Sequence, residues 1–186
     1  DLSEPAQDTT TSEGQQYTTL ISLPEMVSIE TLYFGGGTPS LLTPQELGAF
    51  IRQVRQQWVH APLEEITVEA NPDDLTPKYL AALRQEGVNR LSIGIQSFHD
   101  RDLQWMHRRH TARSAIEAVR AARQAGFDNL SIDLIYGLPH MTLEEWRDNL
   151  QQALALRPEH LSAYHLTIEP QTPFGRAKAR GTLQEI

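Results

Sequence analysis

Three polar side chains at the ends of apolar stretches could do chemistry together. Glu69 and Gln96 lie at the carboxyl ends of predicted strands, and Asp133 lies close to the end of another. Ligands bind at the carboxyl ends of the strands in α/β sheets and barrels. An unpaired carboxylate within an apolar strand is costly, so Asp133 is the hardest of the three to explain by folding alone. Glu69 could instead form an ion pair with Arg90, and Gln96 could simply satisfy a strand end.

A glycine run, Gly35-Gly36-Gly37, follows an apolar stretch and precedes Thr38-Pro39-Ser40. Glycine lets another molecule approach the backbone closely and reaches positive φ without strain. A helix is predicted to begin just after Thr43, and a strand, a glycine turn and a helix together aim free N–H groups at an anion or carboxylate. The alternative is a tight turn that lets a strand fold back.

Alternating strands and helices must position these residues. Expected strands cover 29–34, 65–70, 90–95, 129–135 and 160–166, and expected helices cover 44–58, 77–86, 112–125 and 143–156. Two helix starts carry capping boxes, Thr43 with Glu46 and Thr142 with Glu145. The pattern predicts βαβ units and a parallel sheet with right-handed crossovers. Five strands are too few to close an eight-stranded barrel, so the sheet is open or part of a larger barrel.

Side-chain alternation within the strands predicts one apolar and one polar face. Successive side chains point to opposite faces, and a parallel sheet covered on both faces would be almost wholly apolar. Here polar residues alternate with apolar ones. We therefore expect helices on the apolar face and a cavity or hydrogen bonds on the polar face, which carries Thr67, Glu69, Ser92, Gly94, Gln96, Ser131 and Asp133.

The composition of the 186 residues limits the possible functions. The length fits one domain, and the net charge of −8 gives no sign of a nucleic-acid surface. There is no transmembrane-length apolar run and no signal-peptide pattern. The seven histidines show no metal-ligand spacing, and the absence of cysteine excludes disulfides and thiolate sites in this chain. Residues 1–28 are expected to be a flexible tail, with 29–186 as the core.

Five motifs, in their order and spacing, resemble a known family. From Ile29 onward the chain is similar to radical S-adenosylmethionine proteins, specifically the oxygen-independent coproporphyrinogen III oxidase family. The residues of its motifs are closer to those of the heme-chaperone branch than to those of the oxidase. The motifs are Tyr33-Phe34-Gly35-Gly36-Gly37-Thr38-Pro39-Ser40, Glu69-Ala70-Asn71-Pro72, Asn89-Arg90-Leu91-Ser92-Ile93-Gly94-Ile95-Gln96-Ser97-Phe98, Ile132-Asp133-Leu134-Ile135-Tyr136-Gly137-Leu138-Pro139 and Leu166-Thr167-Ile168-Glu169-Pro170.

The resemblance implies an α/β fold, a partial (β/α)6 barrel that is incomplete at both ends here. It also implies a [4Fe–4S] cluster and S-adenosylmethionine at the open top. Glu69 would contact the cofactor's ammonium group, since charge-assisted bonds are strong. Arg108 lies in His107-Arg108-Arg109-His110, which could instead be a solvated charged loop. The full set of implied S-adenosylmethionine contacts is Gly36, Gly37, Thr38, Glu69, Gln96, Arg108, Asp133 and Thr167.

The missing cysteines are the main departure from the family. Its members hold the cluster through Cys-x3-Cys-x2-Cys after the first strand, whereas residues 1–28 stand there in this sequence. Thiolates hold such clusters. We therefore expect no metal ligands, no catalytic residues and no reductive cleavage of S-adenosylmethionine from this polypeptide.

Three functions are compatible with these observations. The first is the core of a heme chaperone that binds heme or porphyrin as cargo and delivers it to acceptor proteins. The second is an oxygen-independent coproporphyrinogen III oxidase, and the third, much weakened by the five motifs, is a barrel enzyme that binds a sugar phosphate through the glycine loop. We expect a cytoplasmic protein without a membrane segment, whose acceptor could be membrane-associated.

Overall fold

A five-stranded parallel sheet forms the centre of the computed structural model, which describes residues 29–58, 62–171 and 173–181. The strands lie in sequence order, and each pairs in parallel with the next. They are β1 (Thr31–Phe34), β2 (Glu65–Ala70), β3 (Arg90–Gln96), β4 (Asn129–Tyr136) and β5 (His160–His165). The predicted strands are confirmed, and their ends differ from the predicted ones by at most two residues.

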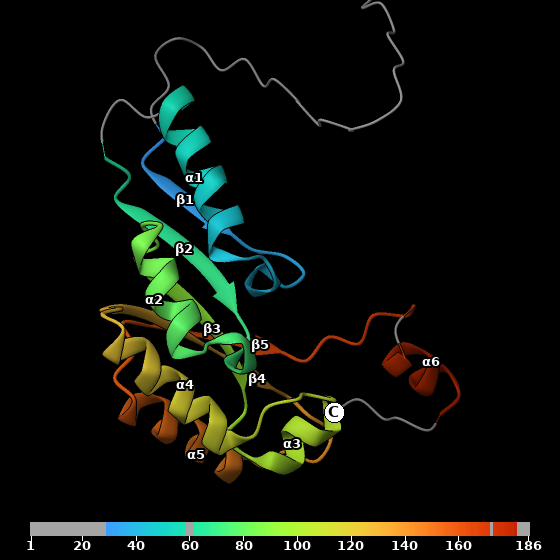
Figure 1. The fold of residues 1–186 in the computed structure, drawn as a ribbon. Helices are drawn as coiled ribbons and strands as arrows, with labels where there is room; N and C mark the ends of the chain where they lie inside the picture. Colours follow the sequence, from blue (N-terminus) through green and yellow to red (C-terminus); the bar gives the residue numbers. More distant parts are fainter. Residues whose placement is uncertain (1–28, 59–61, 172, 182–186) are drawn as a thin grey trace, which may run out of the picture.

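The main helices lie along one side of this sheet (Figure 1). Right-handed crossovers between strands in unbroken sequence order place every connecting helix on the same face. These helices are α1 (Pro44–Trp58), α2 (Pro77–Gln85), α4 (Ala112–Gln124) and α5 (Leu143–Ala155). The strand order never reverses, which separates this fold from a doubly wound sheet. The architecture is a half-barrel whose inner face is free of connecting helices.

The core fills the layer between the sheet and the helices, as the alternation predicts. The apolar side chains on the helix-covered face of the three central strands are at most 6% exposed, and they are Ile66, Val68, Ala70, Leu91, Ile93, Ile95, Leu130, Ile132 and Leu134. On α1, Leu47 and Ile51 are buried, whereas the neighbouring Phe50 is 59% exposed. It packs edge-on against Phe34 of β1, the edge strand of the described sheet.

Both predicted capping boxes form. The Thr142 hydroxyl accepts from the Glu145 amide while the Glu145 carboxylate accepts from the Thr142 amide. Thr43 and Glu46 are paired in the same way at the start of α1. Gly126 follows α4 at a φ of +88°, in the left-handed conformation that ends helices. The helix boundaries therefore follow local chemistry.

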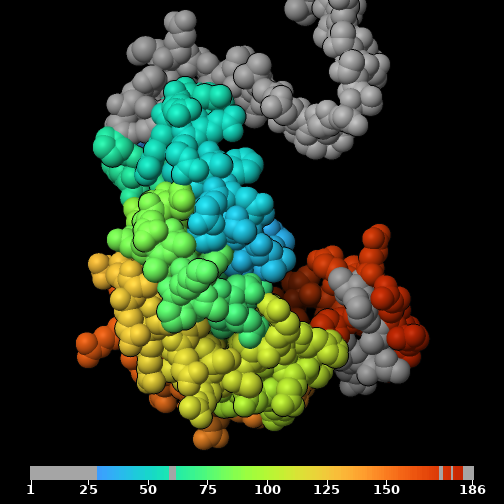
Figure 2. All heavy atoms as spheres, viewed as in Figure 1, coloured from blue at the N-terminus to red at the C-terminus, as the bar shows by residue number. Residues whose placement is uncertain are grey.

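Two short helices were not predicted from the sequence. α3 (Asp100–Trp105) lies between the predicted strand 90–95 and the predicted helix 112–125, and its N-cap residue His99 makes no side-chain capping bond. α6 (Pro173–Ala179) lies beyond the last predicted element. Its Phe174 ring stacks on Trp105 at 4.6 Å and on His107 at 5.9 Å between centroids. These aromatic contacts place α6, which is drawn in red in Figure 2, beside α3. Within the described residues, no helix is both long and apolar enough to cross a membrane.

Candidate functional site

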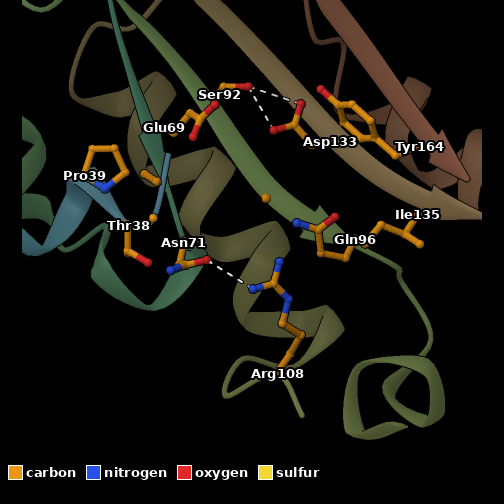
Figure 3. A pocket seen from close by; sticks show the side chains of 13 residues that line it. Thr38, Pro39, Glu69, Asn71, Ser92, Gln96, Arg108, Asp133, Ile135 and Tyr164 are labelled. Atoms are coloured by element: carbon orange, nitrogen blue, oxygen red, sulfur yellow. Dashed lines mark hydrogen bonds between the residues drawn. The ribbon is translucent and has the colours of Figure 1, made fainter. Parts of the chain in front are cut away.

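A cavity of about 320 Å³ opens where the carboxyl ends of the central strands meet the glycine loop (Figure 3). Six of the eight predicted site residues line it, and these are Gly37, Thr38, Glu69, Gln96, Arg108 and Asp133. They come from segments far apart in sequence, and the parallel order of the strands brings them together. The cavity lies on the polar face of the sheet, as the alternation predicted.

Glu69 has both carboxylate oxygens held by β1 and the loop that follows it. The Tyr33 hydroxyl donates to Oε1 at 2.9 Å, and the Gly36 amide donates to Oε2 at 3.0 Å. Burial and the neighbouring Glu69 raise the pKa of Tyr33 to about 12, so Tyr33 is a neutral donor. The alternative ion pair with Arg90 does not form, because Arg90 lies 3.7 Å from Glu65 and donates to Thr67 instead.

Asp133 extends from β4 toward β3. Its two oxygens accept from the Ser92 hydroxyl at 3.1 and 2.9 Å, and the Ser131 hydroxyl lies 3.4 Å away. Burial raises the pKa of Asp133 above its ordinary value, and the charge of Glu69 raises it further, against the lowering effect of the serine hydrogen bonds. The carboxylate is therefore supported by hydroxyl donors and has no paired cation among the described residues, which leaves it able to bind a donor or a cation in the cavity.

Arg108 and Gln96 form the rim of the cavity. Arg108 donates weakly to the Asn71 side-chain oxygen at 3.5 Å, and burial lowers its pKa, although a guanidinium stays charged in proteins. Its neighbour Arg109 points away and pairs with Asp74 at 3.2 Å. The segment is therefore not simply a solvated charged loop, since Arg109 forms ion pairs and Arg108 lines the cavity. Gln96 has a φ of +71° where the β3–β4 register shifts.

Two predicted contacts are placed differently from the other six. Thr167 is exposed, its hydroxyl lies 3.5 Å from the His165 carbonyl, and it does not line the cavity. The Gly36 amide already donates to Glu69, so in this structure it supports the carboxylate. Gly36 lines a second cavity, of about 240 Å³, beside Phe34 and Leu42. The roles of both residues toward a cofactor stay predictions.

Several residues that build the cavity were not singled out as site residues from the sequence. Asn71, Ser92 and Tyr164 line it, and Tyr33 supports it through Glu69. The alternation that identified the polar face gave a signal for Ser92. The same alternation, extended to the first and fifth strands, also places Tyr33 and Tyr164 on the inner face.

The cavity presents charges of both signs to a ligand. Glu69 and Asp133 offer carboxylates, and Arg108 offers a guanidinium. Charge-assisted hydrogen bonds to such groups are the strong ones, so the site suits a molecule that carries an ammonium and a carboxylate together. Among the described residues, no group of three His, Asp or Glu side chains is arranged to hold a metal ion.

Comparison with protein families finds a match to the radical SAM superfamily over residues 18–153. The match begins within residues 1–28, which lie outside those the structure describes. The chain is 42% identical over 147 residues to the heme chaperone HemW of Escherichia coli, covering 79% of this chain and 39% of that protein. It is 38% identical over 160 residues to the heme chaperone HemW of Lactococcus lactis, covering 86% and 42%.

Solved structures support the same fold. Coproporphyrinogen III oxidase (HemN) from Escherichia coli superposes with a TM-score of 0.72 at 31% identity, over 80% of this chain and 35% of that one. Archaeal Elp3 from Methanocaldococcus infernus gives the same TM-score at 19% identity, which concerns the fold alone. The chain spans about two fifths of the length of these curated chaperones.

Proposed function

Because the chain belongs to the radical SAM superfamily, we propose that it is the S-adenosylmethionine-binding core of a heme chaperone. Two curated relatives named heme chaperones, at 38% and 42% identity, support heme as the cargo. We further propose that the protein delivers heme to acceptor proteins and works in the cytoplasm. The cavity between the carboxyl ends of β2, β3 and β4 is the observation that carries the cofactor part of the proposal.

The donor set of the cavity fits S-adenosylmethionine. The amino-acid part of this compound carries an ammonium and a carboxylate, and its sulfonium adds a second positive charge. Glu69 would receive the ammonium, and Arg108 the carboxylate, while Asp133 is free to accept from further donors of the ligand. S-adenosylmethionine would serve as the precursor of a radical when it is bound beside a reduced cluster.

The residues present do not fit the cluster itself. The 186 residues include no cysteine, and thiolates are the ligands of four-iron clusters. Histidine replaces cysteine in some clusters, but only beside remaining cysteines. We therefore assign no redox step to this stretch of chain, and its proposed role is binding and orientation.

Isothermal titration with S-adenosylmethionine tests the cofactor site. We expect weak binding by the parent chain, because no cluster contributes to the affinity. Glu69→Gln and Arg108→Met should each weaken it about tenfold, the size expected for a lost hydrogen bond to a charged group. Arg113→Ala, which removes an exposed ion pair to Glu117 on α4, is the matched control and should bind as the parent does. Equal affinities for parent and both cavity variants would contradict the site.

Heme titration followed by absorbance tests the cargo. We expect saturable binding at one heme per chain that survives gel filtration. The second candidate, an oxygen-independent coproporphyrinogen III oxidase, is favoured by the 31% identical solved structure. Saturable binding of coproporphyrinogen III with no retention of heme would favour the oxidase over the chaperone.

A further inference from the structure

We propose that Tyr33 is a positioning residue for the S-adenosylmethionine site, because its hydroxyl fixes the direction in which the Glu69 carboxylate faces the cavity. The inference rests on the proposed function for the identity of the ligand. The hydrogen bond between Tyr33 and Glu69 is independent of that function, because the structure shows it directly. Tyr33 is not among the residues that line the cavity, so its effect on a ligand is indirect. Its hydroxyl donates to Glu69, and Ser92, which also lines the cavity, lies close to the same hydroxyl.

Two donors, one on each oxygen, hold the Glu69 carboxylate. Tyr33 donates to Oε1 at 2.9 Å from β1, and Gly36 donates to Oε2 at 3.0 Å from the loop. A glutamate side chain otherwise loses considerable rotamer freedom when a ligand orders it. With both oxygens already bonded, the carboxylate is oriented before a ligand arrives, and its remaining lone pairs stay available.

Gly35 makes this arrangement possible. A Cβ atom there would lie 2.6 Å from the Tyr33 ring and 2.9 Å from Glu69 Oε1. The first glycine of the run thus leaves room for the Tyr33–Glu69 contact, a use of this residue that differs from a turn or a direct ligand contact. A phenylalanine at position 33 would keep the ring in place and lose only the donor.

Because Tyr33 is exposed, the effect of its hydroxyl on ligand binding can be measured without a change in the stability of the fold. The residue is 52% exposed, so removal of its hydroxyl leaves the core unchanged. Net hydrogen-bond contributions of ordinary size predict that Tyr33→Phe weakens S-adenosylmethionine binding about three- to tenfold. If Tyr33 acts through Glu69, the same substitution should have no effect once Glu69 has been replaced by alanine.

The experiment combines a ligand-free and a ligand-binding measurement. Amide hydrogen exchange at Gly36, followed by nuclear magnetic resonance, reports how firmly Glu69 is held, because Glu69 accepts from that amide. Titration with S-adenosylmethionine then covers the parent, Tyr33→Phe, Glu69→Ala and the double variant. Tyr136→Phe is the control, since Tyr136 is also exposed and packs on Trp146, away from the cavity lining.

Faster exchange at Gly36 in Tyr33→Phe, with weaker binding that disappears in the Glu69→Ala background, supports the proposal. Unchanged exchange at Gly36 overturns it. An equal loss of affinity in the parent and Glu69→Ala backgrounds also overturns it, because Tyr33 would then act by a route other than Glu69. A parent that fails to bind S-adenosylmethionine overturns the proposed function, and the exchange comparison then decides the positioning of Glu69 by itself.

Discussion

Asp133 shows at the scale of one residue how a carboxylate in the proposed binding site can reduce the stability of the fold. Its carboxylate lies on the inner face of β4, where burial raises its pKa. The folded chain therefore holds the Asp133 proton more tightly than the unfolded chain does. The resulting stabilisation is fully present below the unfolded pKa and is lost as the pH rises through the folded pKa. At neutral pH the ionised carboxylate works against folding, which is a common property of functional sites.

Asp133→Asn should therefore be more stable than the parent at neutral pH. The amide oxygen can still accept from Ser92, while the charge that burial penalises is gone. The advantage should shrink as the pH falls toward the ordinary aspartate pKa of 3.8. Urea denaturation at several pH values measures it. Asp128→Asn, at an exposed position just before β4, is the control, and a stability difference independent of pH would contradict the explanation.

Gly36 illustrates a backbone requirement. Its φ is +80°, and a Cβ atom there would meet nothing within 4 Å. A Cβ atom therefore meets no obstacle in the ligand-free protein, and the left-handed conformation is the expected source of the effect of Gly36→Val. Such a conformation costs an ordinary residue about 1–2 kcal/mol, so we expect the loop to shift and S-adenosylmethionine binding to fall.

Gly36→Asn is the matched variant, because asparagine tolerates the left-handed region better than valine does. Thermal denaturation and titration of both variants should rank valine as the more damaging. Equal effects would indicate that side-chain bulk, and not backbone conformation, matters at this position.

At the scale of elements, β1 is an edge strand of the described sheet, and exposed apolar side chains lie near it. Within the part of the chain that the structure describes, its only sheet partner is β2. Leu41, Leu42 and Phe50 nearby are 73%, 40% and 59% exposed. Unpaired strand edges template pairing with other chains, and exposed apolar groups add a driving force.

We expect the purified chain to self-associate through this edge. Leu42→Glu combined with Phe50→Glu should shift the equilibrium toward monomer in sedimentation velocity, because burial of the charges would be costly. Leu154→Glu, at a 63% exposed position on α5, should leave it unchanged. Monomeric behaviour of the parent across a wide concentration range would contradict the prediction.

At the scale of the whole molecule, the half-barrel exposes the face that we propose binds the cofactor, and the sequence carries no thiolate ligands for a cluster. Anaerobic incubation of this chain with iron and sulfide should give no stable [4Fe–4S] cluster, because no cysteine is present among its 186 residues. Iron analysis with electron paramagnetic resonance checks this. A reducible four-iron signal from the unmodified chain would falsify the claim.

Much of this architecture was already determined by the sequence. Strand and helix periods, capping boxes and the helix-ending glycines are local, since each depends on residues a few positions apart. Side-chain alternation also fixed which face would be polar, and hence that Glu69, Gln96 and Asp133 would point the same way. The five motifs then indicated to which family the chain belongs.

Only the tertiary structure decided which side chains meet. The Tyr33 hydroxyl reaches a residue 36 positions away, and Arg108 lines the cavity while Arg109 pairs with Asp74. Thr167 lies outside the cavity, although its motif is intact. α6 is placed by the stacking of Phe174 on Trp105. Such contacts depend on the curvature of the sheet and on loop paths, and no local period or motif encodes these distances.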